Sequence, residues 1–215
     1  MEERTAPPAR EAAMLLEIER ASAQNQDALA GLFDVVPPLA VAAAELTRFH
    51  RALARQCAAG IATITLLGFH DGRPVGYTFA LTDRSRFFLA LARRHPWLFL
   101  RHLGGHTIRA IAGRLFARAR HTTNMPLLSA SMPERAVYMQ TTGTRPDLRG
   151  LGIGSRLKAA MVETAKAERY TMLYSQMQPE KGAWARAANR DGWRMERQPD
   201  GTFMGVYVIR REGES

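Results

Sequence analysis

The residues of this chain with the clearest chemical potential form a glycine-rich run, Arg149-Gly150-Leu151-Gly152-Ile153-Gly154. A β-prone stretch, residues 137–142, precedes the run, and a helical pattern of apolar residues follows it from Leu157 onward. A loop between a strand and a helix points free backbone N–H groups and the positive end of the helix dipole at an anion. Glycines let the main chain approach such a ligand closely. The run therefore predicts a pyrophosphate-binding loop, and the alternative is a tight turn without a ligand.

Two common phosphate-binding loops do not fit this run. A Walker loop ends in Gly-Lys-Ser/Thr, whereas this one ends in Gly154-Ser155-Arg156. A dinucleotide fingerprint needs the spacing G-x-G-x-x-G and an acid at the end of the next strand, about 20 residues on. Here the spacing is G-x-G-x-G, and the next expected strand, 171–177, ends without an acid. Neither kind of nucleotide loop is therefore favoured.

The run does match the pattern Arg/Gln-x-x-Gly-x-Gly/Ala, with Pro146 three residues before Arg149. In this it resembles the acyl-CoA loop of the GNAT N-acetyltransferase superfamily. The resemblance implies an acyltransferase that moves an acyl group, acetyl by default, from acyl-CoA directly to an amine acceptor. No metal takes part in the implied reaction. The residues implied to bind acyl-CoA are Thr144, Arg149, Gly150, Leu151, Gly152, Ile153, Gly154 and Ser155.

The elements around the loop follow the order of the GNAT fold. We expect strands at 14–20, 62–69, 75–81, 136–144, 170–178, 193–197 and 202–210, and helices at 26–33, 39–57, 154–168 and 180–190. Asp71-Gly72 is the expected hairpin turn between the second and third strands. The expected architecture is α/β, a mixed central β-sheet flanked by helices, in a single domain over residues 1–215.

One segment, residues 83–121, exceeds a minimal domain of this kind. It contains nine arginines and no acid between Arg84 and His121, in a chain whose formal net charge is +10. Its apolar pattern predicts an inserted basic helical hairpin, broken at His95-Pro96. Four roles remain open for residues 84–121: a lid over the acceptor, an apolar wall for a longer acyl chain, a peripheral contact with a membrane or another polyanion, or a solvated hairpin.

Catalytic candidates lie on the fourth strand. The resemblance implies that this strand splays from the fifth, that pantetheine pairs with its free edge, and that the backbone N–H of Thr142 stabilises the oxyanion. Glu134 and Tyr138 are candidate catalytic side chains, with Tyr77 and Gln140 nearby. Strand alternation predicts that Tyr138, Gln140 and Thr142 share one face.

The chain departs from the family at two positions. The tyrosine that usually protonates the leaving thiolate falls at Ala188, and the usual asparagine falls at Lys181. The proton donor is then Tyr174, Tyr207 or water, or the protein is a CoA-binding regulator without catalysis. A basic protein that associates with a membrane or polyanion is a further alternative. Nucleic acid is not favoured as a partner, because no motif that reads bases accompanies the charge.

Composition sets the remaining limits. The lone cysteine, Cys57, allows no disulfide within the chain, and the first eight residues predict neither a signal peptide nor an anchor. We therefore expect a cytoplasmic protein. The four histidines at 95, 102, 106 and 121 lie among positive charges without acids or cysteine, so we expect no metal site. The acceptor, a small-molecule or peptide amine, and the oligomeric state cannot be read from the sequence.

Overall fold

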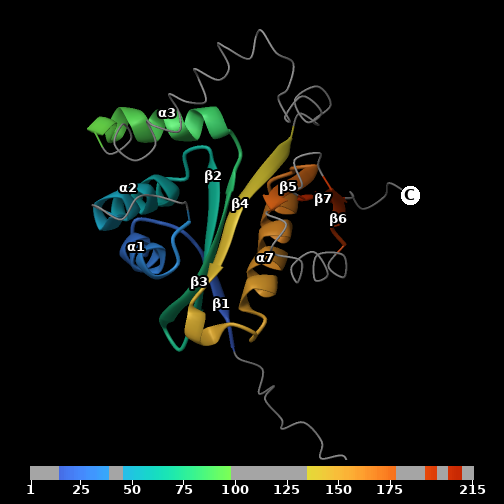
Figure 1. Cartoon of the computed structure of the whole chain (residues 1–215), viewed down its shortest axis with the longest axis horizontal. Coiled ribbons are helices and arrows are strands. Elements are labelled where there is room, and N and C mark those ends of the chain that lie inside the picture. The colour runs from blue at the N-terminus through green and yellow to red at the C-terminus, as the bar shows by residue number, and fades with distance from the viewer. Residues whose placement is uncertain (1–14, 39–45, 98–134, 178–191, 198–202, 210–215) are drawn as a thin grey trace, which may run out of the picture.

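Seven strands form one mixed sheet in the computed structural model (Figure 1). The structure describes residues 15–38, 46–97, 135–177, 192–197 and 203–209. The strand order is β1-β2-β3-β4-β5-β7-β6, and among these described strands only β4 and β5 pair in parallel. The strands are β1 (Glu17–Arg20), β2 (Thr63–His70), β3 (Arg73–Leu81), β4 (Ala136–Thr144), β5 (Met172–Met177), β6 (Arg194–Arg197) and β7 (Phe203–Val208).

Helices cover both faces of this sheet, which confirms the predicted α/β architecture. α1 (Gln26–Val35), α2 (Leu46–Ala58) and α3 (Arg84–Arg94) lie on one face, and α7 (Ile153–Ala167) lies on the other (Figure 1). A short 3₁₀ helix, η1 (Pro146–Leu148), precedes α7. The predicted helix at 180–190 and the start of the predicted helix at 39–57 lie outside the described residues.

Each face of the sheet has its own apolar core. Phe33 of α1, Tyr77 and Phe79 of β3, and Phe87 of α3 belong to the cluster beneath α1–α3. On the other face α7 buries a stripe at every fourth position, which is the pattern of a helix with one apolar side. The buried residues of that stripe are Ile153, Leu157, Met161 and Ala165.

The β2–β3 hairpin turns where the sequence predicts. Asp71 and Gly72 have φ values of 51° and 70°. Two successive left-handed residues match the twist of a two-residue hairpin, and Asp-Gly is a preferred pair for such a turn. The hairpin places β3 between β2 and β4, so β3 supports the strand that carries the candidate catalytic residues.

α3, the first part of the predicted hairpin at 83–121, is packed against the core. The side chain of Asp83 caps the helix by accepting a hydrogen bond from the Arg86 backbone N–H at 2.9 Å. Phe87 and Leu91 are each only 1% exposed and belong to the cluster beneath α1–α3. α3 ends at Arg94, at the predicted break. α3 is the part of the predicted hairpin that the structure describes; residues 98–121 lie outside the described part of the chain, so the insertion stays a prediction.

No helix in the described part of the chain is long and apolar enough to cross a bilayer.

Candidate functional site

The glycine-rich loop joins the end of β4 to the start of α7, as the sequence predicts. Gly150 and Gly152 have φ values of +87° and +74°, in the left-handed region that glycine adopts without strain. A Cβ at either position would meet no atom within 4 Å, so this side of the loop is open. The loop therefore needs glycine for its backbone path and leaves its surface accessible.

The N-terminus of α7 is available to an anion. Gly152 is the N-cap, and no side chain caps this end. The first intrahelical bond runs from the Arg156 N–H to the Gly152 carbonyl at 3.0 Å, so the preceding N–H groups have no partner within the helix. They carry the positive end of the dipole of a 15-residue helix. Arg149 is exposed beside them.

The one acid of this loop is already neutralised. Asp147 accepts hydrogen bonds from Arg145 Nε at 3.1 Å and from its Nη2 at 3.2 Å. The hydrogen bond from Arg145 holds the pKa of Asp147 below its ordinary value. A phosphate bound at the α7 N-terminus would thus meet Arg149 without an unpaired carboxylate in the loop.

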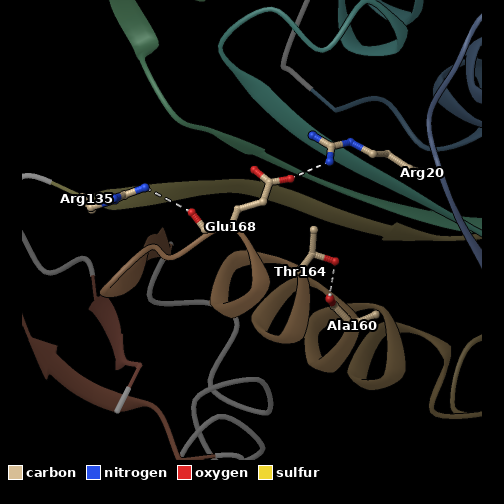
Figure 2. A network of polar contacts seen from close by, with 5 residues as sticks. All are labelled: Arg20, Arg135, Ala160, Thr164 and Glu168. Carbon is tan, nitrogen blue, oxygen red and sulfur yellow. Dashed lines mark hydrogen bonds and ion pairs between the residues drawn. The ribbon is translucent and has the colours of Figure 1, made fainter. Parts of the chain in front are cut away.

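Contacts at both ends hold α7 in its direction. At its start, Ile153 and Leu157 are buried against Val75 of β3. At its end, Arg20 of β1 forms an ion pair with Glu168, and Arg135 Nη2 donates to the Glu168 carbonyl oxygen at 3.3 Å (Figure 2). These contacts tie the helix to β1, β3 and the segment before β4. They therefore fix the direction in which the α7 N-terminus points.

β4 has a free edge next to this loop. Its parallel pairing with β5 covers only Ala136, Val137 and Tyr138. β4 continues to Thr144, so within the described residues positions 139–144 have no partner on the β5 side. The two strands diverge toward the glycine loop, as the resemblance implies, and the edge offers backbone donors and acceptors to an extended ligand.

A β-bulge at Gln140 changes the faces of β4. Phe79 pairs with Thr141 while Ala80 pairs with Met139, which leaves Gln140 without a partner on β3. Tyr138 packs toward α1–α3. Thr142 lies on the α7 face, because its Oγ1 is 4.0 Å from Met139 Sδ and its Cγ2 would be 3.9 Å from a Cβ at Gly154. The prediction of one shared face for Tyr138, Gln140 and Thr142 was therefore wrong, since simple alternation ignores the extra residue.

Two tyrosines lie where β4 and β5 begin to diverge, at Tyr138 and Tyr174, and we call this point the apex. Tyr138 and Tyr174 are opposite each other in the register, and their ring centroids are 5.0 Å apart. Burial raises the pKa of Tyr174, the neighbouring Tyr138 raises it further, and the Arg84 guanidinium opposes the shift. Tyr174 is therefore protonated at neutral pH and can act there as a proton donor.

Tyr77 and Cys57 are buried in the core. Tyr77 is buried, its hydroxyl donates to the Val36 carbonyl at 2.7 Å, and burial raises its pKa. Burial also raises the pKa of Cys57 to about 12, against a hydrogen bond with Thr65. Neither side chain is placed to act as a base or a nucleophile. Glu134 and Ala188 lie outside the described residues.

A cavity beside α7 was not anticipated from the sequence. It has a volume of about 430 Å³, a size typical of small-ligand sites. Its wall combines the first turns of α7 with Trp193, which directly precedes β6, and Tyr207 of β7. The lining residues are Ser155, Arg156, Lys158, Ala159, Val162, Glu163, Trp193 and Tyr207. Of this cavity, the sequence offered only the dipeptide Gly192-Trp193. That Trp193 lies next to α7 cannot be seen before the fold is known.

No metal centre is present in the part of the chain that the structure describes. Those residues contain no group of three or more histidine, cysteine, aspartate or glutamate side chains that could hold an ion. His102, His106 and His121 lie outside them.

Comparisons with known proteins agree with this geometry. The acetyltransferase of the GNAT family from Streptococcus pneumoniae superposes with a TM-score of 0.54 at 14% identity, covering 91% of this chain and 100% of that one. PaiA N-acetyltransferase from Thermoplasma acidophilum, in complex with coenzyme A, gives 0.52 at 9% identity, covering 91% and 100%. NAA60 from Arabidopsis thaliana, in complex with acetyl-CoA, gives 0.54 at 12%, covering 91% and 99%.

Sequence comparison supplies the family itself. None of the curated proteins matches this sequence significantly. The sequence model described as "Acetyltransferase (GNAT) family" matches residues 41–192, which is most of the 215-residue chain and includes β4, the glycine loop and α7. The chain therefore belongs to the acetyltransferase (GNAT) family, whose reaction transfers an acyl group from acyl-CoA.

Proposed function

We propose that this protein transfers an acetyl group from acetyl-CoA directly to the amine of a small molecule or peptide. The observation that carries the proposal is the free edge of β4, which leads straight to the open N-terminus of α7. An extended pantetheine arm and a pyrophosphate need these two features in this order.

Each part of CoA has a matching part of the site. The pyrophosphate binds at Arg149–Gly154 and Ser155, and pantetheine pairs with the β4 edge at Thr144. The adenosine fits the cavity beside α7, because Ser155 lines that cavity and also belongs to the first turn of the helix. Trp193 and Tyr207 provide aromatic surface for a base there. The acyl group then points away from the loop, toward the apex of the strands.

The transfer itself forms a C–N bond and breaks a C–S bond. The amine nitrogen attacks the thioester carbonyl carbon, and the backbone N–H of Thr142 donates to the oxyanion. Collapse of the tetrahedral intermediate expels the CoA thiolate, which takes a proton from the Tyr174 hydroxyl. The amine loses its proton to water, and the Tyr174 phenolate takes a proton back from water. This assignment fills the role that Ala188 cannot perform.

The apex favours a short acyl group. An acyl chain that extends from the thioester toward the apex meets the Tyr138 and Tyr174 rings, whose centroids are 5.0 Å apart. Tyr138 also packs against the cluster beneath α1–α3, which restricts its movement. Acetyl is therefore the proposed donor. No acyl-enzyme forms, because burial raises the pKa of Cys57 to about 12.

One observation favours a second function. A member that has Ala188 in place of the usual tyrosine fits a CoA-binding regulator without catalysis. The two functions differ in turnover and not in CoA affinity, so both quantities need to be measured.

The test combines calorimetry with a thiol-release assay on an amine panel. Arg149→Glu should weaken acetyl-CoA binding by at least about tenfold, because a charge-assisted hydrogen bond contributes about 1.5–3 kcal/mol. Arg73→Glu makes the same charge change at the exposed start of β3 and should leave affinity unchanged. Full affinity in Arg149→Glu would contradict the CoA site. Tight acetyl-CoA binding without release of CoA on any amine would favour the regulator.

A further inference from the structure

α3 has an outward face whose chemistry differs from that of its buried face. Phe87 and Leu91 point into the core, whereas Arg86, Leu89 and Arg93 occur at the spacing i, i+3 and i+7 and are all exposed. Leu89 is 50% exposed, so its apolar side chain reaches the solvent. This face therefore consists of an apolar residue between two guanidinium groups.

Trp97 lies three residues beyond the end of α3 and is also exposed. It follows the His95-Pro96 break at the end of α3 and is 82% exposed, the largest exposure among the large apolar residues that the structure describes. Tryptophan combines an apolar ring system with an N–H donor, and it is favoured where an apolar phase meets water. We use the name outer face of α3 for Arg86, Leu89 and Arg93 together with the exposed Trp97 that follows the helix.

The charge of the outer face is not balanced within the helix. α3 contains four arginines and no acid, and Asp83, just before it, accepts the Arg86 backbone N–H. No arginine of α3 forms an ion pair with another residue in the described part of the chain. Arg94 donates to Gln56 Oε1 at 3.4 Å, and the Arg84 guanidinium lies 5.9 Å from the Phe88 ring centroid. All four arginines are exposed, and Arg86 and Arg93 are the two that share one side of the helix with Leu89.

We propose that the outer face of α3 binds the surface of an anionic lipid bilayer. A bilayer surface offers phosphate groups to Arg86 and Arg93 and, a few ångströms deeper, apolar surface to Leu89 and Trp97. Guanidinium groups can reach the headgroups while their aliphatic stems lie along the apolar boundary. A nucleic acid would satisfy the charges but would leave Leu89 exposed to water. An anionic bilayer therefore matches both the charged and the apolar residues of the outer face, whereas a nucleic acid matches only the charged ones.

The position of α3 keeps its outer face away from the CoA loop. Figure 1 shows α3 near the end of the sheet where β4 begins, whereas the glycine loop and the start of α7 lie at the opposite end. A bilayer against the outer face would therefore leave the CoA loop accessible. Phe87 and Leu91 anchor the helix in the core, so binding needs no unfolding of α3. The proposal does not depend on the acceptor or on catalysis.

Vesicle co-sedimentation of the full chain tests the proposal. Vesicles of phosphatidylcholine with about one third phosphatidylglycerol should bind the protein, and pure phosphatidylcholine vesicles should not, with binding lost at high salt. Arg86→Glu/Arg93→Glu should weaken binding by roughly 30-fold or more, because each arginine near an anionic surface contributes about fivefold. Arg48→Glu/Arg73→Glu makes the same charge change at exposed positions outside the outer face and should bind nearly as the wild type.

Depth of insertion gives an independent measurement. Bromine-labelled lipid chains should quench tryptophan fluorescence in the wild type, and Trp97→Ser should remove most of that quenching while acetyl-CoA affinity and melting temperature stay unchanged. Absence of binding to the anionic vesicles, or equal binding by Arg86→Glu/Arg93→Glu, would overturn the proposal. A salt-sensitive shift of RNA or duplex DNA without vesicle binding would also overturn it and would identify a nucleic acid as the partner.

Discussion

The Tyr77 ring lies directly over Gly143, so closely that a Cβ at Gly143 would be 2.6 Å from Tyr77 Cε1 and 2.7 Å from its Cζ. The two residues are opposite each other on β3 and β4. The Tyr77 hydroxyl donates to the Val36 carbonyl, so the ring also connects the end of α1 to the sheet. Gly143 therefore sets how closely this ring can approach β4, next to the proposed oxyanion donor Thr142.

Gly143→Ala should destabilise the fold. The added methyl cannot avoid the Tyr77 ring, which is held by its hydrogen bond and by complete burial. Overpacking of this kind costs about 1–3 kcal/mol, measured as the change in the urea unfolding free energy. Gly31→Ala is the matched control, because a Cβ there meets nothing within 4 Å and the residue lies within α1. That control should gain about 0.5–1 kcal/mol, and an equal loss in both variants would contradict the prediction.

Alanine substitutions at Gly152 and Gly60 can separate the cost of backbone strain from an effect on acetyl-CoA binding. Gly152 and Gly60 have φ values of +74° and +65°, and a Cβ at either would meet no atom within 4 Å. Alanine at each position should therefore cost a similar free energy of unfolding, about 1–2 kcal/mol. Only Gly152→Ala should also weaken acetyl-CoA binding by calorimetry, because its methyl lies on the open side of the loop. Equal affinities in the two variants would show that the ligand does not approach Gly152.

Sequence patterns predicted the elements and the loop because both depend on local physics. Helical spacing at Ile153 and Leu157, left-handed glycines and the Asp71-Gly72 turn are properties of short segments. The bulge at Gln140 could not be predicted, because it arises from the pairing of β4 with β3. The packing of α3 on the core was likewise missed, since the density of arginine concealed the stripe formed by Phe87 and Leu91.

The cavity beside α7 is the second feature beyond the reach of local patterns. It joins the first turns of α7 to Trp193 and Tyr207, which come from a distant part of the chain. Only the strand order places those two aromatic residues next to the helix. The candidate site was thus predictable where one continuous segment forms it, and not where separate segments meet.

Tyr138→Ala should lengthen the acyl chain that the enzyme accepts. Removal of this ring opens the apex next to Tyr174 without touching the glycine loop. The ratio of kcat/KM for butyryl-CoA to that for acetyl-CoA should rise by about tenfold or more, since each methylene that gains an apolar environment contributes about 0.8 kcal/mol. Affinity for CoA itself should not change. An unchanged ratio with normal CoA affinity would show that the acyl group does not reach the apex.

Tyr174→Phe should lower kcat by about 10²-fold at pH 7 and leave the KM for acetyl-CoA nearly unchanged, because it removes a proton donor and keeps the ring. Burial and Tyr138 raise the pKa of Tyr174, so the wild-type kcat should fall only in strongly alkaline solution. That alkaline decline should be absent in the variant. A pH profile of the same shape in both proteins would assign Tyr174 a packing role.

The buried thiol of Cys57 should make the free energy of unfolding depend on pH in alkaline solution. Its pKa is about 12 in the folded protein and 9.0 in the reference state, because burial disfavours the thiolate. When the pKa of an acid is higher in the folded than in the unfolded state, the free energy of unfolding is at its full value below the unfolded pKa. It then falls as the pH rises from the unfolded pKa toward the folded pKa, because only the unfolded state loses its proton there. Between pH 9 and 12, Cys57 should therefore cost about 1.4 kcal/mol of stability per pH unit.

Comparison with Cys57→Ala isolates this effect from tyrosine and lysine titration. The variant leaves a small cavity, so the wild type should be the more stable protein at pH 7. That advantage should shrink from pH 9 upward and reverse by about pH 11, as followed by urea unfolding. Iodoacetamide should label Cys57 at pH 8 only when the protein is unfolded. A constant difference between the two proteins across pH 7–11, or rapid labelling of the folded chain, would place the thiol in a solvated environment.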